Sequence, residues 1–325
     1  MAKGRWRWLR NPRMWWIIFV IVGTTLIWQA WQQIPRLTIT HEMMGRMNDP
    51  SEVRLIFVGD TGTGSDGQKA VAQQLESLCR SVDPAGVFLL GDNFYQTGVE
   101  SVADPLWESR FEKMYSGECL EKIPFYAILG NHDYRSVPEA QIAYTRERGG
   151  RWIMPARYYS LRFGSILEIG AADTNFPERC GIPAFCSIDW LMDKLKNSTA
   201  AWKILAGHHP IFSGGKYRRL KWLAHFTLPE LYCRSGASAY IAGHDHGLQH
   251  LHGKSTQAKC EIEQFVSGGG GAELYPIERI PDKTLYSESA YGVLIGRFTQ
   301  FEQRYEFFPV GTAEPQYVWS TKKEQ

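Results

Sequence analysis

The sequence predicts an α/β fold in which two mixed β-sheets face each other and helices cover both outer surfaces, a four-layer αββα sandwich built by residues 52–325. Three observations predict it. Short apolar runs recur along the chain, and each stops at glycine followed by aspartate, asparagine or histidine. Amphipathic helical patterns separate the first of these runs, which indicates parallel strands joined by helices. Towards the C-terminus the runs follow one another closely, which is typical of antiparallel pairing.

Each apolar run has the length of a buried strand that meets a polar loop. The runs are VRLIFVGD (53–60), GVFLLGDN (86–93), PFYAILGNHD (124–133), WKILAGHHP (202–210) and SAYIAGHDH (238–246). Between the first two runs, Val71, Leu75 and Leu78 recur at helical spacing and predict a helix over residues 66–81. Ser187 is the expected cap of a second helix, in SIDWLMDKLKNS. EQFVSGGGG, GVLIGRFT and QRYEFFPV predict a more antiparallel second sheet.

Residues 1–13 form a basic tail, and residues 14–35 that follow are uncharged and mostly apolar. As a helix this segment spans roughly 33 Å, enough to cross a hydrocarbon core of about 30 Å. It lacks a convincing cleavage site and has tryptophans near both ends, which favours a membrane anchor over a cleaved signal peptide. Five preceding cations place the N-terminus in the cytoplasm and the remaining chain outside it, in a periplasmic, extracellular or lumenal space. Cleavage would instead give a secreted form. Residues 36–51 are expected to be a linker.

The net charge of +2 belongs to the basic tail. Removing its five cations leaves 31 basic against 34 acidic residues, a formal charge of −3. A nucleic-acid-binding protein carries a basic face on its folded part, so no nucleic-acid partner is expected. Six cysteines, an even number, fit an oxidising compartment and disulfide bonds. Their pairing is open, although Cys180 and Cys186 are close enough in sequence to close one loop.

Six side chains that bind metals well each lie just past the end of a predicted strand: Asp60, Asp92, Asn131, His208, His244 and His246. Loops at the C-terminal edge of such sheets gather their ligands in one place. One such residue alone would be better explained as a turn or surface residue, but five strand ends carry them. Carboxylates suit hard cations and imidazoles suit iron, zinc or manganese, so the set predicts two metal ions about 3.5–4 Å apart with a bridging carboxylate. In an extended segment His244 and His246 point to one side, and Asp245 points away.

Five ordered blocks resemble the calcineurin-like metallophosphoesterases. They are GDTG (59–62), GDNFY (91–95), GNHD (130–133), AGHHP (206–210) and GHDH (243–246). Within that family, GDNFYQTGV and QIAYTRE (141–147) look like the small, tartrate-resistant, mammalian-type branch of the purple acid phosphatases. The resemblance implies an acid phosphatase that hydrolyses phosphate monoesters of small molecules, nucleotides or phosphoproteins. A metal-bound hydroxide would attack phosphorus.

The resemblance also implies which residues bind the metals. Fe³⁺ would be bound by Asp60, Tyr95 and His246, and the phenolate–iron bond of Tyr95 would absorb visible light. Asp92 would bridge to a divalent metal, Fe²⁺, Zn²⁺ or Mn²⁺, which Asn131, His208 and His244 would hold. His132 would contact the phosphate, beside Asn131, and assist the leaving group. Asp133 is expected either to orient a neighbouring histidine or to be a plain turn residue.

The chain departs from the small branch at two places. Lys216 and Tyr217 stand where the branch has an acidic residue and a histidine, and Arg218 and Arg219 follow. This run is either a cationic wall that contacts multiply charged phosphate esters or a solvated surface. Tyr134 also stands where the branch has histidine. Two other functions remain open: phosphodiester or nucleotide hydrolysis by the same fold, and a non-catalytic, membrane-anchored binding domain without metal.

Overall fold

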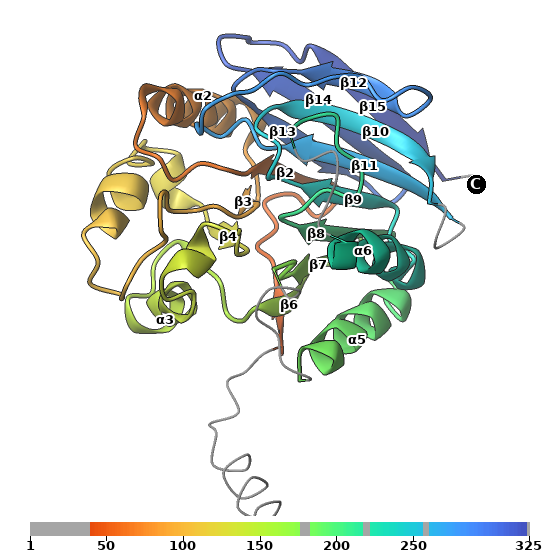
Figure 1. Cartoon of the computed structure of the whole chain (residues 1–325), viewed down its shortest axis with the longest axis horizontal. Helices are drawn as coiled ribbons and strands as arrows, with labels where there is room; N and C mark the ends of the chain where they lie inside the picture. Colours follow the sequence, from red (N-terminus) through yellow and green to blue (C-terminus); the bar gives the residue numbers. More distant parts are fainter. Residues whose placement is uncertain (1–39, 176–182, 217–221, 256–259, 324–325) are drawn as a thin grey trace, which may run out of the picture. The chain divides into compact units, whose positions relative to one another are not determined.

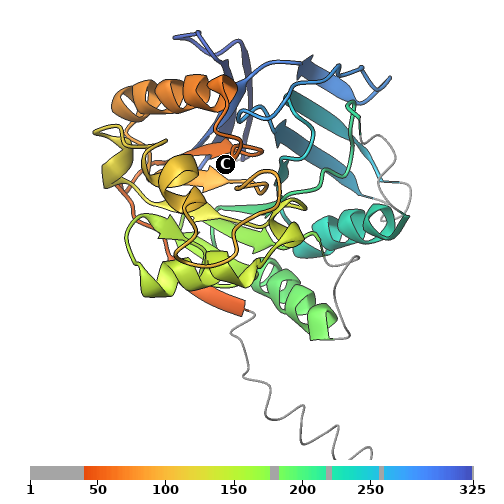
Figure 2. The ribbon, with the colours of Figure 1, turned by 60° about the vertical axis from the view of Figure 1, so that its left-hand side comes forward.

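The computed structural model describes residues 40–175, 183–216, 222–255 and 260–323, and Ile39–Gln325 form one compact unit. In this unit two β-sheets lie face to face and helices cover their outer surfaces (Figure 1). Figure 2 shows helix α2 on one side of the sheets and helices α5 and α6 on the other. The predicted α/β sandwich of two mixed sheets is confirmed.

The seven-stranded sheet combines the first parallel strands of the chain with its last antiparallel ones. Its order is β15 (Tyr317–Lys322), β14 (Glu302–Pro309), β13 (Gly292–Phe298), β2 (Val53–Val58), β3 (Gly86–Leu89), β4 (Phe125–Ala127) and β5 (Trp152–Ile153). Strands β2 to β5 pair in parallel, whereas β13 pairs antiparallel with β2 and β14. The C-terminal hairpin therefore extends the sheet that the N-terminal strands begin.

The eight-stranded sheet is likewise mixed. Its order is β1 (Thr40–Met44), β6 (Tyr158–Phe163), β7 (Leu167–Ala172), β8 (Trp202–Gly207), β9 (Ala239–Ala242), β11 (Glu261–Ser267), β10 (Leu248–Lys254) and β12 (Thr284–Glu288). Strands β7, β8, β9 and β11 are parallel neighbours, so their C-terminal ends meet at one edge.

Hydrophobic clusters separate the layers. Between the sheets, Phe57 and Phe88 of one sheet pack in the same cluster as Ile204 and Ile241 of the other. In β2 the neighbouring side chain, Ile56, points to the opposite face and packs beneath α2. Both faces of the strand are therefore buried, which explains why VRLIFV is nearly continuous in apolar residues instead of alternating.

Helices cover the outer faces of both sheets. Over the seven-stranded sheet lies α2 (Asp66–Val82), where Ser65 accepts a hydrogen bond from the Gln68 N–H, as an N-cap does. Over the eight-stranded sheet lie α5 (Pro183–Lys196) and α6 (Trp222–Ser235). The shorter elements are η2 (Trp107–Glu112), η3 (Leu120–Lys122), η4 (Asp133–Arg135) and α3 (Glu139–Glu147).

The start predicted for the second helix is wrong. Helix α5 begins at Pro183, so Ser187 lies inside it and cannot cap it. Proline suits a first helical position because its φ is already helical and its missing N–H needs no partner there.

The expected linker over residues 36–51 contains part of the fold. Strand β1 pairs in parallel with β6 at the edge of the eight-stranded sheet. Met43 packs against the inter-sheet core, whereas Met44 is 65% exposed, and Lys194 of α5 donates to Glu42 at 2.7 Å. Because an edge strand directs only alternate side chains at the protein, its sequence THEMM carries little apolar signal.

Two disulfide bonds join neighbouring elements. Cys79 of α2 is bonded to Cys119 beside η3, and Cys233 of α6 is bonded to Cys260 just before β11. Such bonds persist in extracellular and lumenal compartments, which agrees with the expected export. Cys180 lies outside the described residues, so its pairing with Cys186 stays a prediction.

The basic tail (1–13) and the anchor predicted over residues 14–35 also lie outside the described residues. Among the helices that the structure describes, none is both long and apolar enough to cross a bilayer. The anchor stays a prediction.

Replacing Met43 with serine should lower the free energy of unfolding by about 1–3 kcal/mol, because it removes a packed side chain from the inter-sheet core. The same replacement at exposed Met44 is the matched control, with an expected change of less than about 0.5 kcal/mol. Urea unfolding of both variants measures the difference. Equal effects would mean that β1 does not belong to the sandwich.

Candidate metal centre

The candidate ligands come from both sheets, and all lie just past the C-terminal ends of parallel strands. The seven-stranded sheet supplies Asp60 after β2, Asp92 and Tyr95 after β3, and Asn131 after β4. The eight-stranded sheet supplies His208 after β8, and His244 and His246 after β9. The structure brings all seven together.

The loops that carry them are strained and tightly apposed. Asp60, Asp92 and His244 have φ values of 61°, 52° and 68°, in the left-handed region that side chains other than glycine rarely adopt. At Gly130, an added Cβ atom would lie 2.1 Å from the backbone nitrogen of Asp92. The glycine of GNHD is therefore required because two ligand loops touch through their backbones.

A first cluster forms around the Tyr95 hydroxyl. This oxygen lies 3.1 Å from Asp60 Oδ1, 2.9 Å from Asp92 Oδ2 and 3.2 Å from His246 Nε2. Asp60 Oδ1 and His246 Nε2 are 3.5 Å apart. Two carboxylates, a phenol and an imidazole thus converge.

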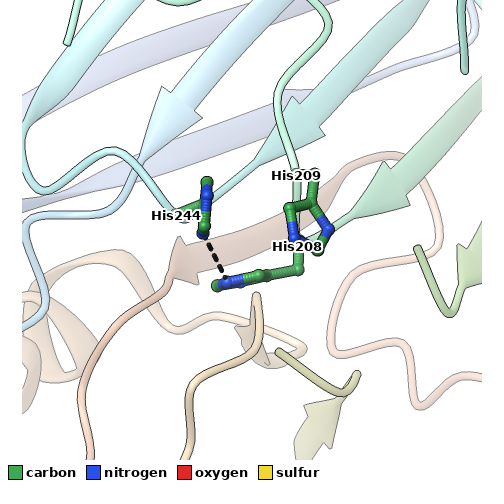
Figure 3. Close-up of side chains that lie close together, drawn as sticks. All are labelled: His208, His209 and His244. Carbon is green, nitrogen blue, oxygen red and sulfur yellow. Dashed lines mark hydrogen bonds between the residues drawn. The ribbon is translucent and has the colours of Figure 1, made fainter. Parts of the chain in front are cut away.

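A second cluster forms around His208. Its Nε2 lies 3.2 Å from Asn131 Oδ1, 3.1 Å from His244 Nδ1 and 3.5 Å from Asp92 Oδ1. Figure 3 shows the His208 and His244 rings meeting, with His209 beside them. Asp92 belongs to both clusters, since one carboxylate oxygen faces each.

Backbone carbonyl groups determine which ring nitrogens can bind a cation. Nδ1 of His208 donates to Leu90 O at 2.8 Å, and Nδ1 of His246 donates to Glu273 O at 2.6 Å. A carbonyl oxygen only accepts, so Nε2 of each neutral ring keeps its lone pair. The His208 lone pair then faces another acceptor, Asn131 Oδ1, which fits a cation between them. The donor set fits two metal ions.

The charges of the first cluster attract positive charge. Burial and the carboxylates of Asp60 and Asp92 raise the pKa of Tyr95 well above its ordinary value. Burial alone would lower the pKa of His246, but hydrogen bonding to Asp60 raises it to about 9. In the second cluster, burial and neighbouring imidazoles lower the pKa of His244 well below its ordinary value. The first cluster thus attracts positive charge, whereas His244 stays neutral and able to coordinate.

Comparison with known proteins agrees with this site. Residues 53–248 match the calcineurin-like phosphoesterase family. The chain is 31% identical to purple acid phosphatase 17 of Arabidopsis thaliana, over 84% of this chain and 85% of that protein. It is 30% identical to tartrate-resistant acid phosphatase type 5 of Mus musculus, over 77% of this chain and 79% of that protein. The chain belongs to the purple acid phosphatases. The resemblance seen in its five blocks is confirmed: the phosphatase hydrolyses phosphoesters at a metal centre.

Solved structures share the fold. GAP50, described as the anchor in the inner membrane complex of Plasmodium, has a TM-score of 0.72 and 22% identity, covering 85% of this chain and 90% of that one. The purple acid phosphatase PPD1 from yellow lupin has a TM-score of 0.67 and 16% identity, covering 86% of this chain and 54% of that one.

Both expectations for Asp133 are wrong. The carboxylate of this buried residue accepts hydrogen bonds from the backbone N–H groups of Gly130 (2.8 Å), Asn93 (3.1 Å) and Phe94 (3.2 Å), and from Gln141 Nε2 (2.9 Å). Among the described residues its partners are thus amide groups and not a histidine. Asp133 joins the loop that carries Asp92 to the loop that carries Asn131. From the sequence alone Asp133 resembles a turn residue, because its hydrogen-bond partners are backbone groups or side chains of other segments, which no local pattern marks.

Other neighbours of the site have partners that sequence cannot reveal. Asp245 points away from the ligands, as predicted, and accepts from Ser213 and Gln249. Tyr134 donates to the buried carboxylate of Asp173. Lys216 is exposed at the end of the described segment, and Tyr217 lies outside the described residues.

In the phosphatase, replacing Asp133 with alanine should abolish most metal binding. Three backbone N–H groups lose their hydrogen-bond acceptor, which lowers the free energy of unfolding by about 1–3 kcal/mol for each group. The two ligand loops also lose their connection. Elemental analysis and thermal unfolding should both show a large decrease. Asp189→Ala is the control, because this exposed carboxylate contacts only the surface residue Arg234 among the described residues. A folded Asp133→Ala protein with full metal content would contradict the assigned role.

Proposed function

We propose that the phosphatase hydrolyses phosphate monoesters at a centre of Fe³⁺ and a divalent metal, Fe²⁺, Zn²⁺ or Mn²⁺. The position of Asp92 carries this proposal. Its Oδ2 lies 2.9 Å from the Tyr95 hydroxyl and its Oδ1 lies 3.5 Å from His208 Nε2. A carboxylate between two groups of ligands suits a bridge between two cations.

The chemistry of each cluster supports the choice of metals. Asp60 and the shared Asp92 offer anionic oxygens, Tyr95 offers a phenol that a bound cation would ionise, and His246 offers an imidazole. A trivalent hard cation prefers such oxygen donors. The second site, with Asn131, His208 and His244, has neutral donors beside the shared carboxylate, which suits a divalent metal. Two bound cations would lower the pKa of water and neutralise phosphate charge.

His132 is the proposed proton donor and phosphate contact. Its Nδ1 donates to Gln96 O at 2.8 Å, which leaves Nε2 for substrate. That Nε2 lies 4.0 Å from Asp92 Oδ2, and the ring lies 4.2 Å from the Tyr95 ring. When it carries a proton, Nε2 would donate to a phosphate oxygen or to the leaving oxygen.

The substrate side of the proposal rests on the sequence. Lys216 and Tyr217, with the two arginines after them, would contact phosphate esters and favour multiply charged ones, such as nucleotides or phosphoproteins. Hydrolysis of phosphodiesters is the alternative within the same fold. A comparison of chromogenic monoester and diester rates discriminates between them. A non-catalytic binding domain is disfavoured because all seven ligand side chains are present.

We also propose that residues 14–35 anchor the phosphatase in a membrane, with the enzyme on the extracytoplasmic side. The support is the length of the uncharged segment, its tryptophans and the five cations before it. The full chain should stay in the membrane pellet after an alkaline carbonate wash, whereas a chain that begins at residue 39 should be released. Release of the intact full chain would contradict the anchor.

Replacing Tyr95 with phenylalanine should remove the visible absorption but leave part of the activity, because Asp60, Asp92 and His246 still hold the metal. Asp92→Asn should reduce hydrolysis of a chromogenic monoester by about a hundredfold or more, because the bridge is lost. Tyr144→Phe, whose hydroxyl donates to Glu112, is the matched control and should keep the colour.

Three outcomes would count against these assignments. An unchanged spectrum in Tyr95→Phe would make Tyr95 a packing residue. Normal turnover in Asp92→Asn would refute the bridge. A wild-type protein that is colourless, metal-free, inactive and cannot be reconstituted would overturn the proposed function.

A further inference from the structure

Three buried polar residues, Asp173, Thr174 and Asn175, follow strand β7 and are called the DTN segment below. Strand β7 pairs with β8 so that Ala172 lies opposite Gly207, which places the segment beside the loop that begins with His208. The three residues are at most 2% exposed. Buried polar groups find their hydrogen-bond partners within the protein. Those partners therefore indicate what the segment holds in place.

Thr174 holds the backbone of His208, a ligand of the second cluster. Its hydroxyl oxygen accepts from the backbone N–H of His208 at 3.2 Å and from that of His209 at 3.1 Å. Two hydrogen bonds to consecutive N–H groups fix the backbone at the end of β8. They thereby fix the point from which the His208 side chain extends.

Asp173 and Asn175 hold the loop that carries Asn131, which follows β4 of the other sheet. The side-chain Nδ2 of Asn175 donates to the backbone carbonyl of Leu129 at 3.1 Å, just before Asn131. The carboxylate of Asp173 accepts from the hydroxyl of Tyr134, just after Asn131. The DTN segment therefore binds this loop on both sides of its metal ligand.

The segment is fixed by its own hydrogen bonds and by a cation. Oδ1 of Asp173 accepts from the backbone N–H of Asn175 at 3.0 Å and from its Nδ2 at 3.2 Å. Arg157 donates to Asp173 Oδ2 at 3.2 Å and also to the Tyr134 hydroxyl. Because a buried carboxylate is costly without a partner, Arg157 keeps Asp173 charged and in place. The segment is thus a fixed reference point for both loops.

The two ligands that the DTN segment holds come from different sheets and approach each other closely. Asn131 Oδ1 lies 3.2 Å from His208 Nε2. Among the described residues, the side chains of the segment make no hydrogen bond to the loops that carry Asp60, Tyr95 and His246. The segment therefore acts on the second cluster and not on the first.

We propose that the DTN segment positions Asn131 and His208 and thereby sets the affinity of the phosphatase for its divalent metal, without contacting that metal. The inference rests on the proposed function for the presence of the metal. Residues that orient the ligands of a metal site change its affinity by about 10- to 100-fold when they are replaced. The iron half of the centre is independent of the segment, because Asp60, Tyr95 and His246 lie on other loops.

Tyr134→Phe tests the segment by removing one hydroxyl group and its hydrogen bond to Asp173. The full chain is loaded with iron and zinc. Elemental analysis gives the content of both metals, and competition with a chelator gives the zinc dissociation constant. Zinc affinity should fall about 10- to 100-fold, whereas iron content and visible absorption should not change.

Tyr159→Phe is the matched control. This buried tyrosine of β6 also donates a hydrogen bond to the other sheet, to Ala127 O at 2.9 Å. Its replacement should lower the free energy of unfolding in urea but leave zinc affinity as it is. The comparison separates loss of a buried hydrogen bond between the sheets from loss of ligand positioning.

A second pair of variants tests the contact to His208. Thr174→Val keeps the shape of the side chain but leaves two backbone N–H groups without their acceptor, so zinc affinity should again fall about tenfold or more. Thr174→Ser retains the hydroxyl group and should restore most of the affinity. Excess zinc should restore monoester hydrolysis in Thr174→Val and in Tyr134→Phe, because only the occupancy of the site is reduced.

The outcomes separate the two proposals. Unchanged zinc affinity in Tyr134→Phe and Thr174→Val would refute the positioning role and leave the proposed function intact. Equal loss of iron and zinc in these variants would make the segment a general support of the fold and refute the inference as well. A wild-type chain that binds no divalent metal beside iron would overturn the proposed function, and the inference with it.

Discussion

The convergence of polar ligand side chains in one buried place is the constraint on which the rest of the structure depends. Carboxylates, a phenol, an amide and imidazoles meet there away from water, and the chain must hold them in place before any cation is bound. Left-handed backbone at Asp60, Asp92 and His244 costs on the order of 1–3 kcal/mol each and persists only when its surroundings leave no alternative. Asp133 supplies part of that restraint, because one buried carboxylate binds the backbone of two ligand loops. The stability of the sandwich thus maintains an arrangement that is unfavourable locally.

The same constraint explains why the inter-sheet core matters for function. Each cluster takes ligands from both sheets: Tyr95 and His246 meet in the first, and Asn131 and His208 meet in the second. A small slide of one sheet over the other would separate both pairs at once. The sheets are held by packed side chains such as Phe57, Phe88 and Ile241, and interiors of this density do not deform continuously. The apolar strands therefore determine ligand distances as well as stability.

The sequence was sufficient for the features that follow from strand ends and poor for those that follow from long-range contacts. The buried strands, helix α2 and the convergence of six polar side chains could be predicted, because apolar runs that end in glycine and a ligand residue mark both the strand and its loop. Tyr95 was expected as a ligand only from the family resemblance. Strand β1 could not be predicted, since only alternate residues of an edge strand face the protein. Asp133 could not either: its partners are backbone N–H groups and the side-chain amides of Gln141 and Asn93, which leave no local pattern. Tyr134 is explained by Asp173 and Arg157, which lie 39 and 23 residues away in the sequence.

His208 and His209 show why neighbouring residues of one type need not share a role. From the sequence AGHHP alone, either histidine could bind a metal. The two histidines differ in the group that contacts Nδ1. This group is a strand-end carbonyl, Leu90 O, for His208 and the hydroxyl of Thr174 for His209. The carbonyl can only accept, so the neutral His208 ring keeps its lone pair on Nε2, whereas the hydroxyl beside His209 Nδ1 can donate or accept. The role of an imidazole in such a site is therefore determined on its side away from the metal, by residues that the ligand motif does not contain.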